Sequence, residues 1–133
     1  MVKIDHFALE VSNLDASIRF YTQLGFKEQV RLVDEDEHES LVLLEMEGGK
    51  LELIQALSEQ NQAQPFEPLT VRPHFCPHLA LQVDDLAAAQ AELAERGVTV
   101  VHGPLEIAGA AKWMYICDPD RNMVEFFQNL GTP

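Results

Sequence analysis

The sequence contains an internal repeat that extends over nearly its whole length. The segment 6–11 (HFALEV) aligns with 78–83 (HLALQV), and the segment 51–55 (LELIQ) aligns with 124–128 (VEFFQ). His78 therefore lies 72 residues after His6, and Glu125 lies 73 residues after Glu52. Each half supplies one imidazole and one carboxylate at almost the same separation. If the halves pack with two-fold symmetry, four metal-ligating side chains can meet at one point.

Each half is expected to fold as β-α-β-β-β, which gives an α+β fold class with curved mixed sheets. Apolar residues recur at helical spacing over 14–24 and 86–94. Asn13 and Asp85 precede these segments as N-caps, and Gly25 and Gly97 follow them at the C′ position. Strand patterns occur at 27–33, 40–47 and 50–55, and again at 99–102, 112–117 and 123–128. Residues 1–133 are predicted to form a single domain, with module 1 at about 1–57, a linker at about 58–76 and module 2 at about 77–130.

Alternation along the strands predicts which way the candidate ligands point. Residues 7, 9 and 11 are apolar and are expected to pack under the helix, which places His6 on the opposite face. The same alternation places Glu52, His78 and Glu125 away from the helices. A carboxylate on such a face needs a partner or a metal. Two imidazoles with two carboxylates suit one divalent ion (Ni, Co, Zn, Mn, Fe or Mg). No cysteine is among these four candidate ligands, which argues against a closed structural zinc site.

Composition excludes several classes of partner. The chain has 9 Lys and Arg against 22 Asp and Glu, and this net charge of −13 argues against nucleic acid and anionic membrane surfaces. No apolar run reaches the ~18 residues that a membrane helix needs, and residues 1–6 enter a strand pattern without a signal-peptide core. Cys76 and Cys117 are too few for a disulfide framework, so a reducing, cytoplasmic location is expected.

These motifs, together with 20–26 (FYTQLGF), 77–86 (PHLALQVDDL) and 118–126 (DPDRNMVEF), resemble the vicinal oxygen chelate superfamily of glyoxalase, bleomycin-resistance and dioxygenase proteins. The resemblance implies tandem βαβββ modules around a cavity, with one divalent metal held by His6, Glu52, His78 and Glu125. Because Glu52 fills the fourth ligand position, the resemblance implies a lyase or isomerase of the glyoxalase I type. The metal would stabilise an enediolate, with Glu125 and Glu52 as the candidate bases. It also implies a homodimer with sites shared between chains.

Two departures and several alternatives qualify this interpretation. Arg121 stands where the family usually has glycine, and Glu10 stands where bacterial glyoxalase I has an arginine that helps to hold glutathione. A glutathione hemithioacetal is therefore a doubtful substrate. An extradiol dioxygenase, a resistance-type enzyme and a small-molecule binding or sequestering protein remain open. The segment 104–111 is either a lid or a plain loop, and the residues expected near a small-molecule substrate are Glu10, Gln82, Trp113, Tyr115 and Phe127.

Overall fold

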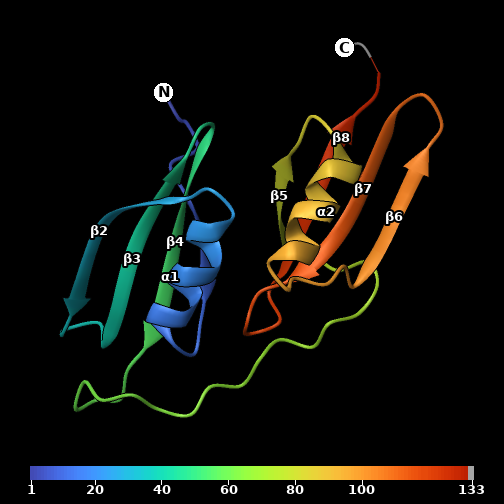
Figure 1. The fold of residues 1–133 in the computed structure, drawn as a ribbon. Helices are drawn as coiled ribbons and strands as arrows, with labels where there is room; N and C mark the ends of the chain where they lie inside the picture. The colour runs from blue at the N-terminus through green and yellow to red at the C-terminus, as the bar shows by residue number, and fades with distance from the viewer. Residues whose placement is uncertain (132–133) are drawn as a thin grey trace. The chain divides into compact units, whose positions relative to one another are not determined.

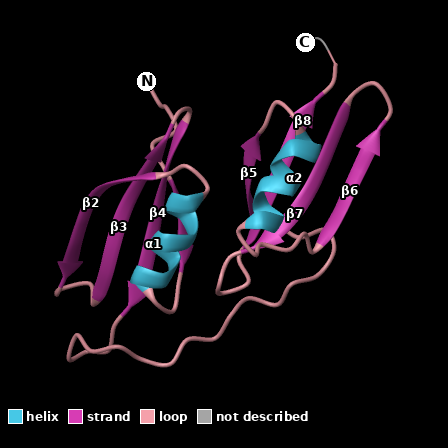
Figure 2. Ribbon diagram, viewed as in Figure 1, coloured by secondary structure: helices cyan, strands magenta, loops and turns pink. Residues whose placement is uncertain are grey.

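The structure is a computed structural model that describes residues 1–131. The chain divides into two compact units, residues 1–68 and 69–133. Each unit contains one helix and one four-stranded sheet (Figures 1 and 2). Neither of the two helices found in residues 1–131 is long and apolar enough to cross a membrane.

The two units repeat the same order of elements. The first unit contains β1 (Phe7–Glu10), α1 (Leu14–Gln23), β2 (Lys27–Asp34), β3 (Glu39–Met46) and β4 (Gly49–Ala56). The second contains β5 (His78–Gln82), α2 (Leu86–Glu95), β6 (His102–Ile107), β7 (Ala111–Cys117) and β8 (Met123–Asn129). The sheet orders are β1-β4-β3-β2 and β5-β8-β7-β6. The first two strands of each order are parallel and the rest antiparallel, so both sheets are mixed and the predicted α+β fold class is confirmed.

The helix of each unit covers one face of its sheet, and the core lies between them (Figure 1). Most buried strand residues lie on the helix-covered face, as the alternation predicted: Leu9, Val42, Leu44, Leu51 and Leu53 in the first unit, and Leu81, Met114, Ile116, Val124 and Phe126 in the second. Tyr115 is buried as well, although it lies on the opposite face. Phe7 is an exception, because its side chain is 38% exposed although the alternation predicted burial. Phe7 is the first residue of the edge strand β1, so fewer neighbouring residues cover it.

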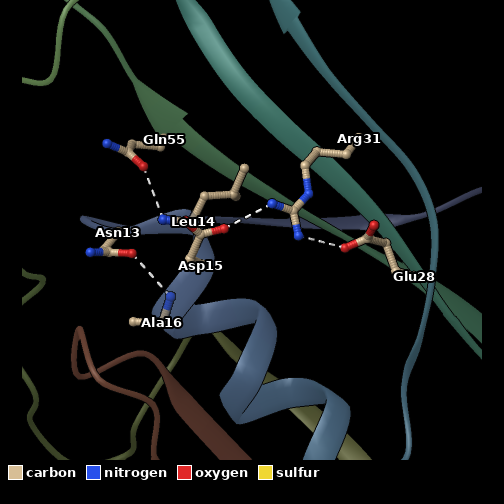
Figure 3. Close-up of polar contacts among 7 residues, drawn as sticks. All are labelled: Asn13, Leu14, Asp15, Ala16, Glu28, Arg31 and Gln55. Atoms are coloured by element: carbon tan, nitrogen blue, oxygen red, sulfur yellow. Dashed lines mark hydrogen bonds and ion pairs between the residues drawn. The ribbon is translucent and has the colours of Figure 1, made fainter.

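Each helix begins with two side-chain caps, and Figure 3 shows those of α1. In the first unit Asn13 Oδ1 accepts from the Ala16 amide at 3.0 Å, and Gln55 Oε1 on β4 accepts from the Leu14 amide at 2.9 Å. In the second unit Asp85 and Gln128 play these roles, at 3.0 and 2.8 Å. The predicted N-caps are therefore confirmed, and each helix start is also tied to the last strand of its own sheet.

An ion pair joins the helix of the first unit to β2, and a glycine follows each of the two helices. Arg31 on β2 donates to Asp15 of α1 at 2.8 Å and to Glu28 at 2.7 Å (Figure 3). Gly25 (φ +115°) and Gly97 (φ +76°) lie just past the helix C-caps in conformations that favour glycine, as the sequence predicted.

The edge strand of the second sheet lies further along the chain than the sequence pattern indicated. We predicted a strand at 99–102 and a lid or loop at 104–111, but β6 spans His102–Ile107 and Ala111 begins β7. The pairing register shifts between His102 and Leu105, so this is an irregular edge strand. Gly103 (φ +99°) passes so close to β7 that a Cβ atom would lie 3.0 Å from the Trp113 carbonyl oxygen. The Gly-Pro pair hid the strand pattern, although edge strands tolerate both residues.

Candidate metal centre

The first half-site lies where β1 begins beside β4. The two strands are parallel, with Ala8 opposite Glu52, and His6 is the residue just before β1. His6 Nε2 lies 3.5 Å from Glu52 Oε1, and His6 Nδ1 lies 2.8 Å from Asp5 Oδ2. The hydrogen bond to Asp5, followed by the charge of Glu52, raises the pKa of His6 despite some desolvation. The same hydrogen bond, together with Lys50, lowers the pKa of Asp5.

The second half-site repeats this arrangement in the other unit. β5 runs parallel to β8 with Ala80 opposite Glu125, which is the same register as in the first unit. His78 Nε2 lies 3.9 Å from Glu125 Oε2. His78 Nδ1 lies 2.8 Å from the carbonyl oxygen of Phe75. Because a carbonyl oxygen can only accept a hydrogen bond, Nδ1 carries the proton in this geometry.

The donor set of each pair fits a divalent metal ion. In the second half-site Nδ1 of His78 is bonded to a carbonyl oxygen, and Nε2 is the ring nitrogen that lies near a carboxylate oxygen. Two electron-rich atoms that face each other are stabilised by a cation between them or by a second proton on the imidazole. A ligand histidine typically donates its other N–H to a carboxylate or a carbonyl, as Asp5 and Phe75 allow here. Imidazole and carboxylate together suit borderline or hard divalent ions.

The structure brings the four predicted ligands together as two pairs, His6 with Glu52 and His78 with Glu125. Within residues 1–131 there is no group of three or more His, Cys, Asp or Glu side chains placed to hold one metal ion. Each unit by itself therefore contributes half of the predicted ligand set.

The predicted substrate-pocket residues lie on the same sheet faces as the two pairs. Trp113 pairs with Phe127 across β7 and β8, and the next pair on that face is Tyr115 with Glu125. Trp113 and Phe127 are half-buried. The alternate residues Met114 and Ile116 of β7 are fully buried on the helix side. Exposed residues complete the set: Gln82 opposite Phe127, and Glu10 opposite Ile54 in the first unit.

Tyr115 is the most perturbed titratable group of the second half-site. Its side chain is buried, and its ring meets the His78 ring edge-on with centroids 5.3 Å apart. Burial, followed by a hydrogen bond to Glu125 and the charge of that carboxylate, raises the pKa of Tyr115 to about 12. The phenol is therefore protonated at neutral pH and can donate a hydrogen bond to the carboxylate.

Sequence reasoning did not find the two groups that orient the histidines. Asp5 directly precedes His6, so a neighbouring carboxylate was a usable signal. The Phe75 carbonyl gave no signal, because a backbone acceptor three residues before His78 depends on how the chain enters β5. The link between Tyr115 and Glu125 follows once the strand register is known.

Comparisons with known proteins agree with this architecture. The family model of the Glyoxalase/Bleomycin resistance protein/Dioxygenase superfamily matches residues 3–126. The chain belongs to this superfamily. This confirms the family resemblance of the sequence motifs.

Individual known proteins resemble the chain over nearly its full length. Virulence protein STM3117 of Salmonella typhimurium is 30% identical, with 95% of this chain and 83% of that protein covered. Lactoylglutathione lyase of Haemophilus influenzae is also 30% identical, with 98% of this chain and 96% of that protein covered. Among solved structures, SMU.1112c gives a TM-score of 0.79 at 26% identity, with 96% and 99% of the two chains covered. Family members of this fold include enzymes, and they typically use a divalent metal.

Proposed function

We propose that the protein is a metal-dependent lyase or isomerase of the glyoxalase I type, which moves a proton next to a carbonyl group of a small-molecule substrate. The observation that carries this proposal is the repeated His–Glu pair, with the same strand register in both units and with each imidazole Nδ1 already bonded. The similarity to lactoylglutathione lyase of Haemophilus influenzae supports the same chemistry. When bound, a divalent ion would supply Lewis-acid stabilisation of negative charge on the substrate oxygens.

In this proposal the two histidines and the two glutamates have different roles. His6 and His78 would hold the metal through Nε2, and Glu52 and Glu125 would complete the ligand set. A carboxylate that leaves the ligand set can accept the proton next to the carbonyl and return it at the neighbouring position.

The predicted cytoplasmic location stays a prediction, with which the free thiols of Cys76 and Cys117 are compatible.

A specific observation favours a second candidate function, small-molecule binding without turnover. Trp113 and Phe127 form a half-buried aromatic pair on the face that carries Glu125. Such a pair can bind an apolar ligand whether or not a reaction follows. Binding of a compound that is never converted, in the presence of every candidate metal, would favour this function.

The first test concerns metal content. Purified protein is expected to hold about one divalent ion per chain, and His6→Ala and His78→Ala are each expected to lose most of it, because each removes a ligand nitrogen. His38→Ala is the matched control, since His38 bonds to Asn61 Oδ1 at 2.8 Å and belongs to neither pair. Metal would be measured by atomic emission after gel filtration. Full occupancy in both ligand variants would remove the site assignment.

The second test concerns the substrate. Turnover of the methylglyoxal–glutathione hemithioacetal is expected to stay below ~1 s⁻¹, the lower end of ordinary enzyme rates, because Glu10 opposes binding of an anionic tripeptide. Ordinary turnover of the glutathione adduct would show that Glu10 does not decide the substrate. Small 2-oxo and 2-hydroxy compounds, other thiol adducts and catechols would be screened with the Ni, Co, Mn, Fe, Zn and Mg forms.

Glu52→Gln is expected to abolish any turnover that the screen finds, while the unfolding temperature changes little.

A further inference from the structure

The two half-sites differ at one position of the repeat. Glu52 on β4 lies directly opposite Leu43 on β3, and Glu125 on β8 lies directly opposite Tyr115 on β7. Leu43 and Tyr115 are 72 residues apart, as are His6 and His78, so they occupy equivalent places. One carboxylate therefore faces an aliphatic side chain, and the other faces a phenol.

The phenol changes what the carboxylate can do. Tyr115 and Glu125 lie directly opposite each other on neighbouring strands, so the phenol is within reach of the carboxylate. Because a carboxylate can only accept, the phenol is the donor of the hydrogen bond that raises its pKa. Leu43 has no donor to offer Glu52. A hydrogen bond donated to a charged oxygen is among the stronger ones in proteins, and it fixes the orientation of the acceptor.

The ring of Tyr115 is itself held in place by the elements of the second half-site. It packs edge-on against His78 and lies 4.9 Å from the ring of Phe75, whose carbonyl oxygen holds His78 Nδ1. The ring of His102 flanks it at 6.2 Å. These contacts leave the side chains of Glu125 and His78 13% and 21% exposed, against 21% and 38% for Glu52 and His6. The second half-site is thus the more enclosed and the more firmly held.

We infer that Tyr115 is a positioning residue that would hold Glu125 in the orientation of a metal ligand, whereas Glu52, opposite Leu43, has no such donor beside it. The inference rests on the proposed function and assigns unequal roles to two carboxylates that the repeat makes equivalent. Tyr115 acts through Glu125 and needs no contact with the substrate.

Tyr115→Phe tests the inference because it keeps the ring and removes only the donor. Calorimetric titration of metal-free protein with Zn²⁺ or Ni²⁺ is expected to show about 10- to 100-fold weaker binding, the usual effect of losing a hydrogen bond to a metal ligand. Tyr21→Phe is the matched control. It removes the same atom from the only other tyrosine, which is buried in the core between α1 and the helix-covered face of its sheet, whereas Glu52 lies on the opposite face. Its metal affinity is expected to equal that of the wild type.

A double-mutant cycle separates positioning from a general structural effect. In a Glu125→Gln background, Tyr115→Phe is expected to cause little further loss of metal affinity. In a Glu52→Gln background it is expected to cause the full loss. Wild-type affinity in Tyr115→Phe, or equal losses in both backgrounds, would overturn the inference while leaving the proposed function intact. A wild-type protein that binds neither metal would instead refute the proposed function, and this inference with it.

Discussion

The hydrogen bonds of the two candidate histidines set which ring nitrogen can bind a metal. In both, Nδ1 is bonded and Nε2 is on the side of the glutamate. The acceptors differ, since Asp5 offers a carboxylate and Phe75 a carbonyl. A carboxylate partner makes an imidazole more basic than a carbonyl partner does. The two histidines are thus oriented alike but are not electronically equivalent.

The raised pKa of Tyr115 leads to a prediction about alkaline pH. The folded state holds the phenol proton up to about pH 12, against 10.0 for an ordinary tyrosine. Stability that depends on this proton is present below pH 10 and is lost as the pH rises toward 12. In chelator-treated protein, the free energy of unfolding is expected to fall more steeply over this range in the wild type than in Tyr115→Phe. Equal slopes in urea titrations at several pH values would contradict the prediction.

Burial also raises the pKa of Cys117, so ionisation of this thiol can change the stability at alkaline pH as well. The absorbance of the Tyr115 phenolate gives a check that does not depend on stability. The difference in absorbance near 295 nm between wild type and Tyr115→Phe isolates one phenol. Its midpoint is expected near pH 12, and Glu125→Gln is expected to lower that midpoint, since it removes the carboxylate charge.

At the residue scale, sequence reasoning identified the candidate ligands but not the groups that contact them. His6, Glu52, His78 and Glu125 were selected because the same pair of residues occurs in both halves of the repeat. The turn at 118–122 is stabilised by hydrogen bonds that sequence reasoning did not predict. Asp118 Oδ1 accepts from the amides of Asp120 and Asn122, at 2.8 Å each. Arg121 there has φ +68°, which explains why the family usually has glycine at this position. The helix N-caps follow a known sequence pattern, whereas these bonds depend on local turn geometry that the sequence pattern did not reveal.

Each helix is joined to its sheet by one glutamine of the last strand. Gln55 and Gln128 are equivalent in the repeat, and both accept from the first helical amide. Gln55→Ala and Gln128→Ala are each expected to lower the free energy of unfolding by about 1–2 kcal/mol, because a part-buried amide loses its acceptor at a helix start. Urea denaturation would measure the change.

Glutamate substitution supplies the control for these two variants. Gln55→Glu and Gln128→Glu keep an acceptor oxygen and place a negative charge where the helix dipole favours it. Both are expected to stay near wild-type stability. Alanine variants that are as stable as the glutamate variants would show that these bonds do not anchor the helices.

At the scale of elements, nine of the ten helices and strands that residues 1–131 form could be placed from the sequence, because hydrophobic periodicity and caps agree. β6 was the exception. Its Gly103-Pro104 pair has low strand propensity, and the strand is formed by pairing with β7. Pairing between strands is a tertiary interaction, so a local pattern could not reveal it.

At the scale of the whole molecule, each unit has a helix on only one face of its sheet (Figure 2). The other face of the first sheet carries apolar side chains around Glu52, including Val30 and Leu32, which are 49% and 45% exposed. Apolar side chains gathered on one sheet face favour a covering partner. Together with the division of the ligands into two pairs, this supports the proposal of a homodimer in which His6 and Glu52 of one chain meet His78 and Glu125 of the other.

Complementation between two chains that each lack one candidate metal ligand tests this assembly. A His6→Ala chain and a Glu125→Ala chain would be co-expressed with different tags and purified in tandem as a heterodimer. If sites are shared between chains, one site of the heterodimer combines both substitutions and the other has neither. Metal occupancy is then expected to recover to about half of the wild-type value, because closed two-fold dimers contain two equivalent sites.

The matched control is a heterodimer of His6→Ala and Glu52→Ala chains. Both substitutions lie in the first module, so every shared site lacks either His6 or Glu52. No recovery of metal occupancy is therefore expected. Sites formed within single chains would give no recovery in either heterodimer, since each chain then carries its own defect. Recovery in the first heterodimer but not in the second is therefore obtained only if each site takes one module from each chain. Equal, low occupancy in both would exclude shared sites.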